Sequence, residues 1–161
     1  MVWGIMPIML IAKGYSLGEV GLVTAVYPAV WGVGQLITGK MADWFCKKKM
    51  LFIGMVLQAI ALLLLIWASS LISYVCLAAL LGWGTAMVYP TFLATVAENT
   101  HPKDRPKSIG IFRLWRDLGY AIGALLTGII ADLVSINAAV VAIGMLTLGS
   151  ALIINHRMKC L

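Results

Sequence analysis

The stretch TGKMADWFCKKKM, residues 38–50, interrupts a chain that is otherwise almost free of charge, and it decides how the chain can fold. A run of mostly apolar residues precedes it, and a similar run follows it. A spanning helix needs about 20 apolar residues, because the hydrocarbon core of a bilayer is about 30 Å thick. The stretch is therefore predicted to connect two membrane-spanning helices.

The composition supports a membrane setting. Of the 161 residues, 62% are hydrophobic and 11% are charged, and the mean hydropathy is +1.00. A soluble domain carries about 25% charged residues, so this chain has an excess of apolar surface that needs lipid. The net charge of +6 comes from bases that lie between apolar runs, which argues against a nucleic-acid partner.

The hydropathy pattern predicts an all-α fold, a polytopic membrane helix bundle that forms one domain over residues 1–161. A partial helix is expected at residues 1–12. At 1.5 Å per residue it would be only about 18 Å long, so we interpret it as the tail of a longer helix. Complete helices are expected at residues 20–39, 50–68, 71–97, 108–131 and 136–154.

The bases predict an orientation, because basic connections stay in the cytoplasm. Five complete spans place eleven of the twelve Lys and Arg residues at one end, and only Lys13 lies at the other. We therefore expect the C-terminus to be cytoplasmic.

Cys46, Cys76 and Cys160 lack metal-ligand spacing and are interpreted as structural. Residues 1–12 have neither a basic region nor a cleavage site typical of a signal peptide.

An internal repeat joins two of the predicted helices. GQLITGKMAD at residues 34–43 matches GALLTGIIAD at residues 123–132 in six of ten positions. The two helices are three apart in the chain, so the copies are expected to run in opposite directions. Inverted repeats of this kind are typical of secondary transporters. The alternative is chance, because Gly, Leu and Ala are common in membrane helices.

The segment GKMADWFCKKK resembles the loop signature of the major facilitator superfamily (MFS), which is written G-x-L-A-D-R-x-G-R-K. YPAVWGVGQLITG, LLGWGTAMVYPTFLATVAE and FRLWRDLGYAIGALLTGIIAD resemble the C-terminal six-helix half of such transporters. The resemblance implies a half with a 3+3 inverted repeat, a truncated first helix and no first six helices. It also implies an integral protein of a prokaryotic inner membrane that moves a small-molecule substrate by alternating access.

The same resemblance implies a conformational latch and a set of partners. Gly39, Asp43 and Lys48 fit the signature, in which the Asp contacts a helix N-terminus of the opposite half. Trp44 and Cys46 depart from it, since the family has a base and a glycine there. The implied partners are the lipid bilayer, a small-molecule substrate and either the missing N-terminal half or a second copy; no cofactor is implied.

A stripe of three residues spaced by four, Tyr27, Trp31 and Gln35, is the candidate cavity surface, and Tyr89 is expected to face the same cavity. The alternative for the stripe is packing between helices, with Gln35 bonded to a neighbouring backbone. The candidate cytoplasmic gate comprises Glu98, Arg113, Arg116 and Asp117.

Within this gate, Arg113 and Asp117 are four apart and can pair. The alternative is an interfacial ion pair with a purely structural role. Gly119 and Gly123 form a G-x-x-x-G pair that predicts close helix packing, and Gly82 and Gly84 are expected to act in the same way.

No enzyme motif is present: the sequence has no Ser-His-Asp set, no His-Glu metal motif and no phosphate-binding glycine loop. Catalytic and metal sites are therefore not expected. Two functions are left open. The first is a transporter half, and the alternative is a non-transporting membrane fragment or accessory subunit.

Overall fold

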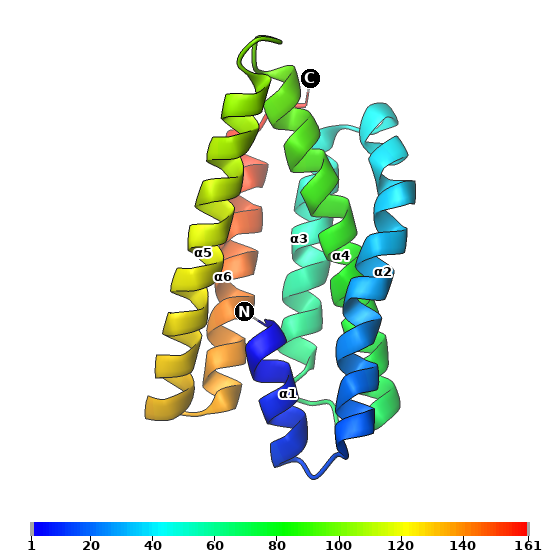
Figure 1. The fold of residues 1–161 in the computed structure, drawn as a ribbon, viewed down its shortest axis with the longest axis vertical. Helices are drawn as coiled ribbons and strands as arrows, with labels where there is room; N and C mark the ends of the chain where they lie inside the picture. The colour runs from blue at the N-terminus through cyan, green and yellow to red at the C-terminus, as the bar shows by residue number, and fades with distance from the viewer. Residues whose placement is uncertain (1, 161) are drawn as a thin grey trace.

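Six helices make up the computed structural model, which describes residues 2–160 (Figure 1). They are α1 (Val2–Ala12), α2 (Leu17–Trp44), α3 (Lys47–Leu64), α4 (Leu71–Glu98), α5 (Arg105–Leu133) and α6 (Ile136–Arg157). The described residues contain no strand. Four helices, α2, α4, α5 and α6, are long and apolar enough to cross a membrane. The expectation of an all-α membrane bundle is confirmed.

Three helices begin at a serine whose side chain caps the first turn. The Ser16 hydroxyl accepts a hydrogen bond from the Glu19 backbone N–H, and the Glu19 carboxylate accepts one from the Ser16 N–H. This capping box satisfies N–H groups that lack a partner within the helix. Ser70 and Ser135 cap α4 and α6 through their hydroxyls. Because Ser16 forms the cap, α2 starts at Leu17, earlier than the apolar pattern alone indicates.

Helix α3 is displaced toward the N-terminus relative to the expected residues 50–68. It begins at Lys47, so the three lysines at positions 47–49 form its first turn. Lysine tolerates this place because its aliphatic stem can lie along the helix while the ammonium group reaches the headgroups. The helix ends at Leu64, and the chain continues in a tighter turn in which the Trp67 N–H donates to the Leu64 carbonyl at 3.2 Å.

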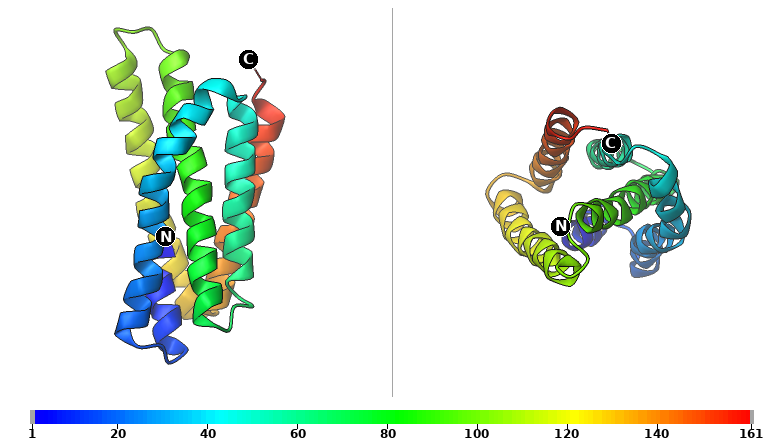
Figure 2. Two further views of the ribbon diagram at one scale, coloured as in Figure 1. Left: turned by 90° about the vertical axis from the view of Figure 1, so that its right-hand side faces the viewer. Right: turned by 90° about the horizontal axis from the view of Figure 1, so that it is seen from above.

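The helices are arranged around α4 and α3. Helix α4 packs against α2 on one side and α3 on the other, and α3 in turn packs against α6. Helix α5 lies beside α6 and touches α4 less extensively. The short α1 lies among the others, in contact with α2, α5 and α6, as the view from above shows (Figure 2).

The two copies of the sequence repeat lie in helices that run in opposite directions. Helix α2 rises in Figure 1 while α5 descends, so Asp43 and Asp132 lie near opposite ends of the bundle. This is the geometry that a repeat separated by three helices requires. The connections rich in Lys and Arg all lie at the end where α2 finishes, as expected from an odd number of complete spans.

The repeat also has a common local structure. Thr38 and Thr127 occupy equivalent positions, and both side chains are buried. The Thr38 hydroxyl donates to the Gly34 carbonyl at 3.0 Å, and the Thr127 hydroxyl donates to the Gly123 carbonyl. Each threonine therefore bonds to the glycine four residues before it, and each of these glycines is buried. The hydrogen bond alone is common, because Thr85, Thr91 and Thr147 also donate to the carbonyl four residues back. What the two copies share beyond it is a buried glycine followed, four residues later, by a buried threonine.

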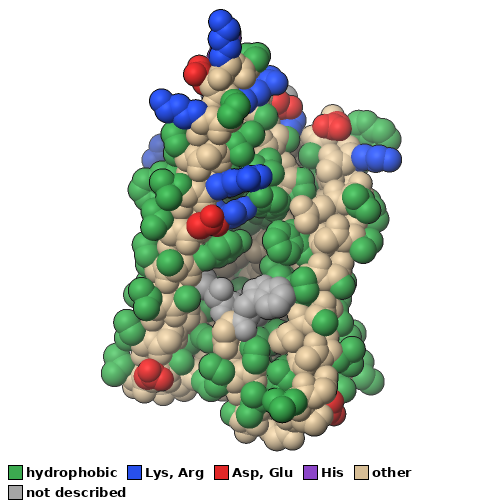
Figure 3. Space-filling model, viewed as in Figure 1, with side chains coloured by type: hydrophobic (Ala, Val, Ile, Leu, Met, Phe, Trp, Pro, Cys, Tyr) green, Lys and Arg blue, Asp and Glu red, His purple; other side chains and the backbone are tan. Residues whose placement is uncertain are grey.

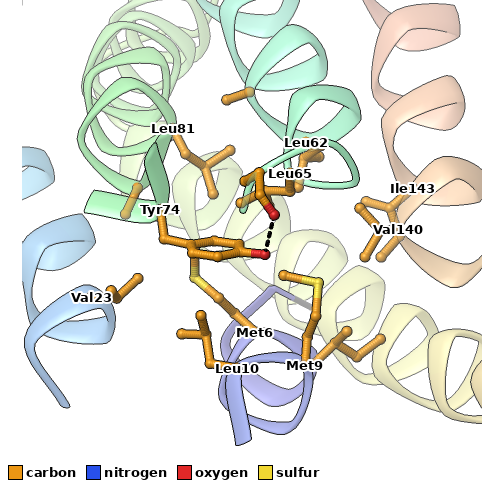
Figure 4. Close-up of a cluster of buried hydrophobic side chains, with 14 of the residues drawn as sticks. Met6, Met9, Leu10, Val23, Leu62, Leu65, Tyr74, Leu81, Val140 and Ile143 are labelled. Atoms are coloured by element: carbon orange, nitrogen blue, oxygen red, sulfur yellow. Dashed lines mark hydrogen bonds between the residues drawn. The ribbon is translucent and has the colours of Figure 1, made fainter. Parts of the chain in front are cut away.

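A buried cluster fills the end of the bundle opposite the basic connections. Tyr74 is fully buried within it, and its hydroxyl donates to the Ala68 carbonyl at 2.6 Å (Figure 4). The Lys13 ammonium group donates to the same carbonyl at 2.9 Å and lies 5.2 Å from the centroid of the Tyr74 ring. A cation is favourable where carbonyls are left free after a helix C-terminus. The single base at this end thus stabilises the turn that follows α3.

Glycines allow α4 to approach both of its neighbours closely. A Cβ atom on Gly82 would lie 2.6 Å from the Tyr27 carbonyl oxygen of α2. A Cβ atom on Gly84 would lie 2.7 Å from the Gly54 carbonyl oxygen of α3. Small residues are typical of such crossings in membranes, because they let backbones come into contact.

The other predicted glycine pair behaves differently. Gly123 is buried, but Gly119 is exposed, and a Cβ atom there would meet no atom within 4 Å. Helix α5 has few neighbours at this level, so within the described residues Gly119 does not lie at a helix crossing.

These glycines lead to a direct test of packing. We expect Gly84→Ala to destabilise the protein by about 1–3 kcal/mol, because the added methyl group overlaps the α3 backbone. Gly119→Ala should leave stability unchanged or raise it by up to about 1 kcal/mol, because alanine favours the helix more than glycine. Thermal unfolding of the natural chain and both variants in one detergent measures the difference. Equal melting temperatures for the two variants would contradict the crossing.

Candidate functional site

Two connected cavities lie between the helices. The larger, of about 900 Å³, is bounded by residues of all six helices. The smaller, of about 390 Å³, lies between α2, α3, α4 and α5. Four residues line both cavities: Trp31, Gln58, Thr85 and Tyr120. The surface is hollowed between α5 and α2, and Lys and Arg side chains gather above the hollow (Figure 3).

Three of the four predicted cavity residues line these spaces. Tyr27 and Trp31 line the larger cavity, Trp31 and Tyr89 line the smaller one, and Gln35 lines neither. The Trp31 ring lies 6.1 Å from the Tyr27 ring and 6.1 Å from the Tyr89 ring, measured between centroids. The Tyr27 hydroxyl donates to Thr85 Oγ1 at 3.2 Å, which fixes α2 against α4 at this level.

Trp31 has an unusual environment. Its indole Nε1–H group is buried and has no hydrogen-bond acceptor within the described part of the chain. The indole nitrogen can only donate, so it needs an acceptor oxygen from elsewhere. An unpaired buried donor costs about 1–3 kcal/mol, which makes it a feature that needs an explanation.

The sequence did not indicate Gln58, Thr85 or Tyr120 as cavity residues. Gln58 was missed because it stands alone in an apolar run, although an isolated glutamine in such a run is itself a weak signal. Thr85 lies one turn after Leu81, and its hydroxyl donates to the Leu81 carbonyl at 2.8 Å, so in sequence it resembles any membrane threonine. Only the packing of α4 shows that it faces the cavity.

The predicted gate residues do not form one network. Asp117 accepts a hydrogen bond from Arg116 Nε at 2.9 Å, whereas the expected pair was Asp117 with Arg113. Arg113 is exposed and forms no ion pair within the described residues. The Arg116 guanidinium lies 5.2 Å from the centroid of the Tyr89 ring, which draws Arg116 toward α4 and the cavity.

Glu98 belongs to a different part of the structure. Its carboxylate lies 2.8 Å from the Lys47 ammonium, so it joins the end of α4 to the start of α3 instead of joining the gate. The Glu98 side chain is 59% exposed, and such exposed pairs contribute about 0–1 kcal/mol. The base that pairs here is Lys47, and the predicted latch base Lys48 forms no ion pair within the described residues.

The predicted latch acid lies in the last turn of α2. Asp43 is exposed and has no ion-pair partner within the described residues, and Gly39 lies one turn before it. A negative charge at a helix C-terminus is unfavourable, because the helix dipole is itself negative there. The charge of Asp43 therefore makes no stabilising interaction with α2 among the described residues.

A disulfide bond lies beside this acid. Cys46 and Cys160 are joined, with their Cα atoms 5.6 Å apart, so the turn between α2 and α3 is linked to the tail that follows α6. Cys76 is free and exposed. A sequence separation of 114 residues gave no indication of this pairing. The described residues contain no group of His, Cys, Asp and Glu that could hold a metal ion.

The helices and cavities define an integral membrane protein built as a helix bundle around an internal space. Residues 1–156 match the family model described as Major Facilitator Superfamily, so the chain belongs to this superfamily. Membership of a transporter superfamily also means that the chain is not an enzyme, and it places the protein in membrane transport in general terms.

Individual relatives agree. The chain is 25% identical to the inner membrane transport protein YnfM of Escherichia coli over 92% of its length. It is 30% identical to the uncharacterized MFS-type transporter YddS of Bacillus subtilis over 85% of its length, and 28% identical to the uncharacterized MFS-type transporter MJ1560 of Methanocaldococcus jannaschii over 92%. It covers 36%, 33% and 39% of these proteins, respectively, and thus spans about a third of their length.

The disulfide can be tested by counting thiols. Alkylation of the purified, denatured protein should modify one cysteine without a reductant and three after reduction, as measured by intact mass. In the Cys76→Ser variant these numbers should fall to none and two. Cys160→Ser should lower stability by less than the about 2–4 kcal/mol typical of soluble proteins, because the helices stay inserted when packing is lost. Three reactive cysteines before reduction would contradict the pairing.

Proposed function

We propose that the chain forms the C-terminal half of a secondary transporter that moves a small solute by alternating access. The observation that carries this proposal is the family match over residues 1–156, combined with an inverted helix repeat around a cavity. Inverted repeats provide two related packings of the same helices, and alternating access uses one repeat moving against another.

The proposed transporter requires a second half in addition to this chain. The chain spans about a third of each relative that it resembles, and the exposed faces of α2 and α5 carry large apolar side chains such as Leu36, Trp115 and Leu125. An N-terminal six-helix half or a second copy of this chain would complete the cavity between these helices.

In this transporter, Gly39, Asp43 and Lys48 act as the conformational latch. The support is physical: Asp43 is exposed at a helix end that disfavours its charge, and it has no partner among the described residues. Contact with the N-terminus of a helix in the other half would give this charge a favourable place. Arg113, Arg116 and Asp117 lie on α5, at the end toward which the bases gather, and act as the cytoplasmic gate.

The orientation follows from the same charges. We place the basic end, and with it the C-terminus, on the cytoplasmic side of a prokaryotic inner membrane. The disulfide would then lie on the side where disulfides are usually rare, so its occupancy in the cell would depend on the redox conditions there.

The alternative function is a membrane fragment or accessory subunit that does not transport. In that role the packing of α4 against α2 and α3 would hold the helices together. One half leaves the cavity wall incomplete, so vesicles that hold the natural chain as a monomer should show no saturable solute flux. Saturable flux from a dimer, or from the chain assembled with a second six-helix half, favours the transporter, and its absence from the correctly folded assembly favours the accessory role.

The latch leads to a specific kinetic prediction. In an assembled twelve-helix transporter, Asp43→Asn should leave expression and thermal stability near those of the natural protein but reduce the turnover rate of transport. The relevant interaction is about 0.3–1 kcal/mol when exposed and up to about 2 kcal/mol when partly buried, and 1.4 kcal/mol is a tenfold change in populations. Lys49→Gln is the control, because Lys47 and Lys48 still mark the same end. If Asp43→Asn transports normally while Lys49→Gln does not, residues 38–50 only fix the orientation through their lysines, and the latch role of Asp43 is wrong.

Single cysteines test the orientation. In a chain with Cys46, Cys76 and Cys160 replaced by serine, His101→Cys marks the basic end and Asn137→Cys marks the opposite end. A membrane-impermeant maleimide added to intact cells should label the cysteine at position 137 and not the one at position 101, because basic connections stay inside. The reverse pattern would place the basic end outside.

A further inference from the structure

We propose that the smaller cavity binds an amphipathic organic anion, with its acid group at Arg116 and the Trp31 indole N–H and its apolar part against the surrounding aromatic rings. One part of the inference rests on the proposed transport function, namely that the bound anion is the solute that is carried. The binding site itself is argued from this chain alone.

The charge of the cavity comes from Arg116. Among the described residues that line the two cavities, Arg116 is the one with a charged side chain. No acidic residue is among them. Arg116 Nε donates to Asp117, and the guanidinium also lies within hydrogen-bonding reach of the Tyr89 side chain. Because a guanidinium group has five N–H donors, three stay available to a ligand. The Asp117 side chain is 60% exposed and that of Arg116 only 26%, so the carboxylate faces outward while the guanidinium faces the cavity.

The position of the guanidinium is restrained. Its central carbon lies 5.2 Å from the Tyr89 ring centroid, and Asp117 holds its Nε from the other side. A planar, pre-positioned guanidinium is well suited to bidentate binding of a carboxylate, phosphate or sulfonate.

A second donor points to the same ligand. Trp31 lines both cavities, and its buried Nε1–H has no acceptor among the residues that the structure describes. The Thr85 hydroxyl accepts from Tyr27 and donates to the Leu81 carbonyl, and it forms no hydrogen bond with the indole. The nitrogen itself is out of contact with the cavity space, so a ligand oxygen satisfies the indole N–H when the Trp31 ring turns toward the cavity.

The remaining wall selects an apolar body. Besides Trp31 and Arg116, the cavity is lined by an aromatic group consisting of Tyr89, Phe92, Phe112, Trp115 and Tyr120. The Phe92 and Phe112 rings pack at 5.7 Å between centroids and close one side. Such a wall favours a ring or alkyl group over a hydrated inorganic ion, and a volume of about 390 Å³ suits a small organic molecule.

Equilibrium binding to the full natural chain in lipid nanodiscs tests the site. The probes are 2-naphthoate and its uncharged isostere 2-naphthamide, measured by calorimetry. We expect naphthoate to bind at least tenfold more tightly than the amide. Arg116→Gln should remove this preference, and Arg116→Lys should retain most of it. Trp31→Phe, which keeps an aromatic ring and removes the donor, should weaken naphthoate binding by about threefold to tenfold. Lys107→Gln removes a charge from the same helix away from the cavity and should change neither affinity.

The outcomes separate this inference from the proposed function. Equal affinity for the two probes, or a loss of preference in Lys107→Gln as large as in Arg116→Gln, would overturn the anion site. Failure of both probes to bind would overturn it as well, and would fit a cavity filled by another helix of a longer chain. Flux of other solutes without naphthoate binding leaves transport standing and removes the site. Charge-selective binding without flux by the dimer or by the chain assembled with a second half leaves the site standing and removes transport.

Discussion

The close contact of α4 with the backbones of α2 and α3 is the constraint on which the rest of the structure depends. Lipid gives no hydrophobic driving force between apolar helices, so their association needs direct backbone and side-chain contact. Gly82 and Gly84, two residues apart, face different neighbours and allow both contacts at the same level of α4. The position of the cavity wall follows, because Tyr27 and Thr85 can bond only when α2 is this close.

Charged groups are used differently at the two ends of the bundle. At one end Lys13 is directed inward to the Ala68 carbonyl and the Tyr74 ring, where it stabilises a turn. At the other end most bases are exposed, and the exceptions are informative. Lys47 joins two helices through Glu98, and Arg116 turns toward the cavity. Asp43 has no ion-pair partner among the described residues, and it lies at a helix end that disfavours its charge.

The candidate site lies where the regular packing of the bundle ends. Helices α2, α3, α4 and α5 enclose space lined with aromatic rings and one cation. The two features that the packing leaves unsatisfied, a buried indole N–H and a guanidinium with free donors, lie in this wall. Both are hydrogen-bond donors, so the cavity wall favours a ligand that carries hydrogen-bond acceptors.

The sequence alone determined the membrane setting, the helices, the gathering of bases at one end and the antiparallel repeat. These properties depend on local composition and on periodicity along the chain, which can be read without knowing the neighbours of a residue. The cavity stripe was partly predictable for the same reason, since Tyr27 and Trp31 share one helical face. Helix ends were less predictable, because Ser16 and the Ala68 carbonyl decide them through specific hydrogen bonds.

Only the tertiary structure decided the partners. Asp117 bonds to Arg116 instead of Arg113, Glu98 pairs with Lys47, and Gly119 faces open space while Gly84 meets a backbone. Spacing along one helix shows which residues can meet, but the neighbouring helix determines which of them do. The pairing of Cys46 with Cys160 and the unpaired Trp31 N–H have the same origin. Each depends on the distance between segments far apart in the sequence, and that distance is set by how the helices pack.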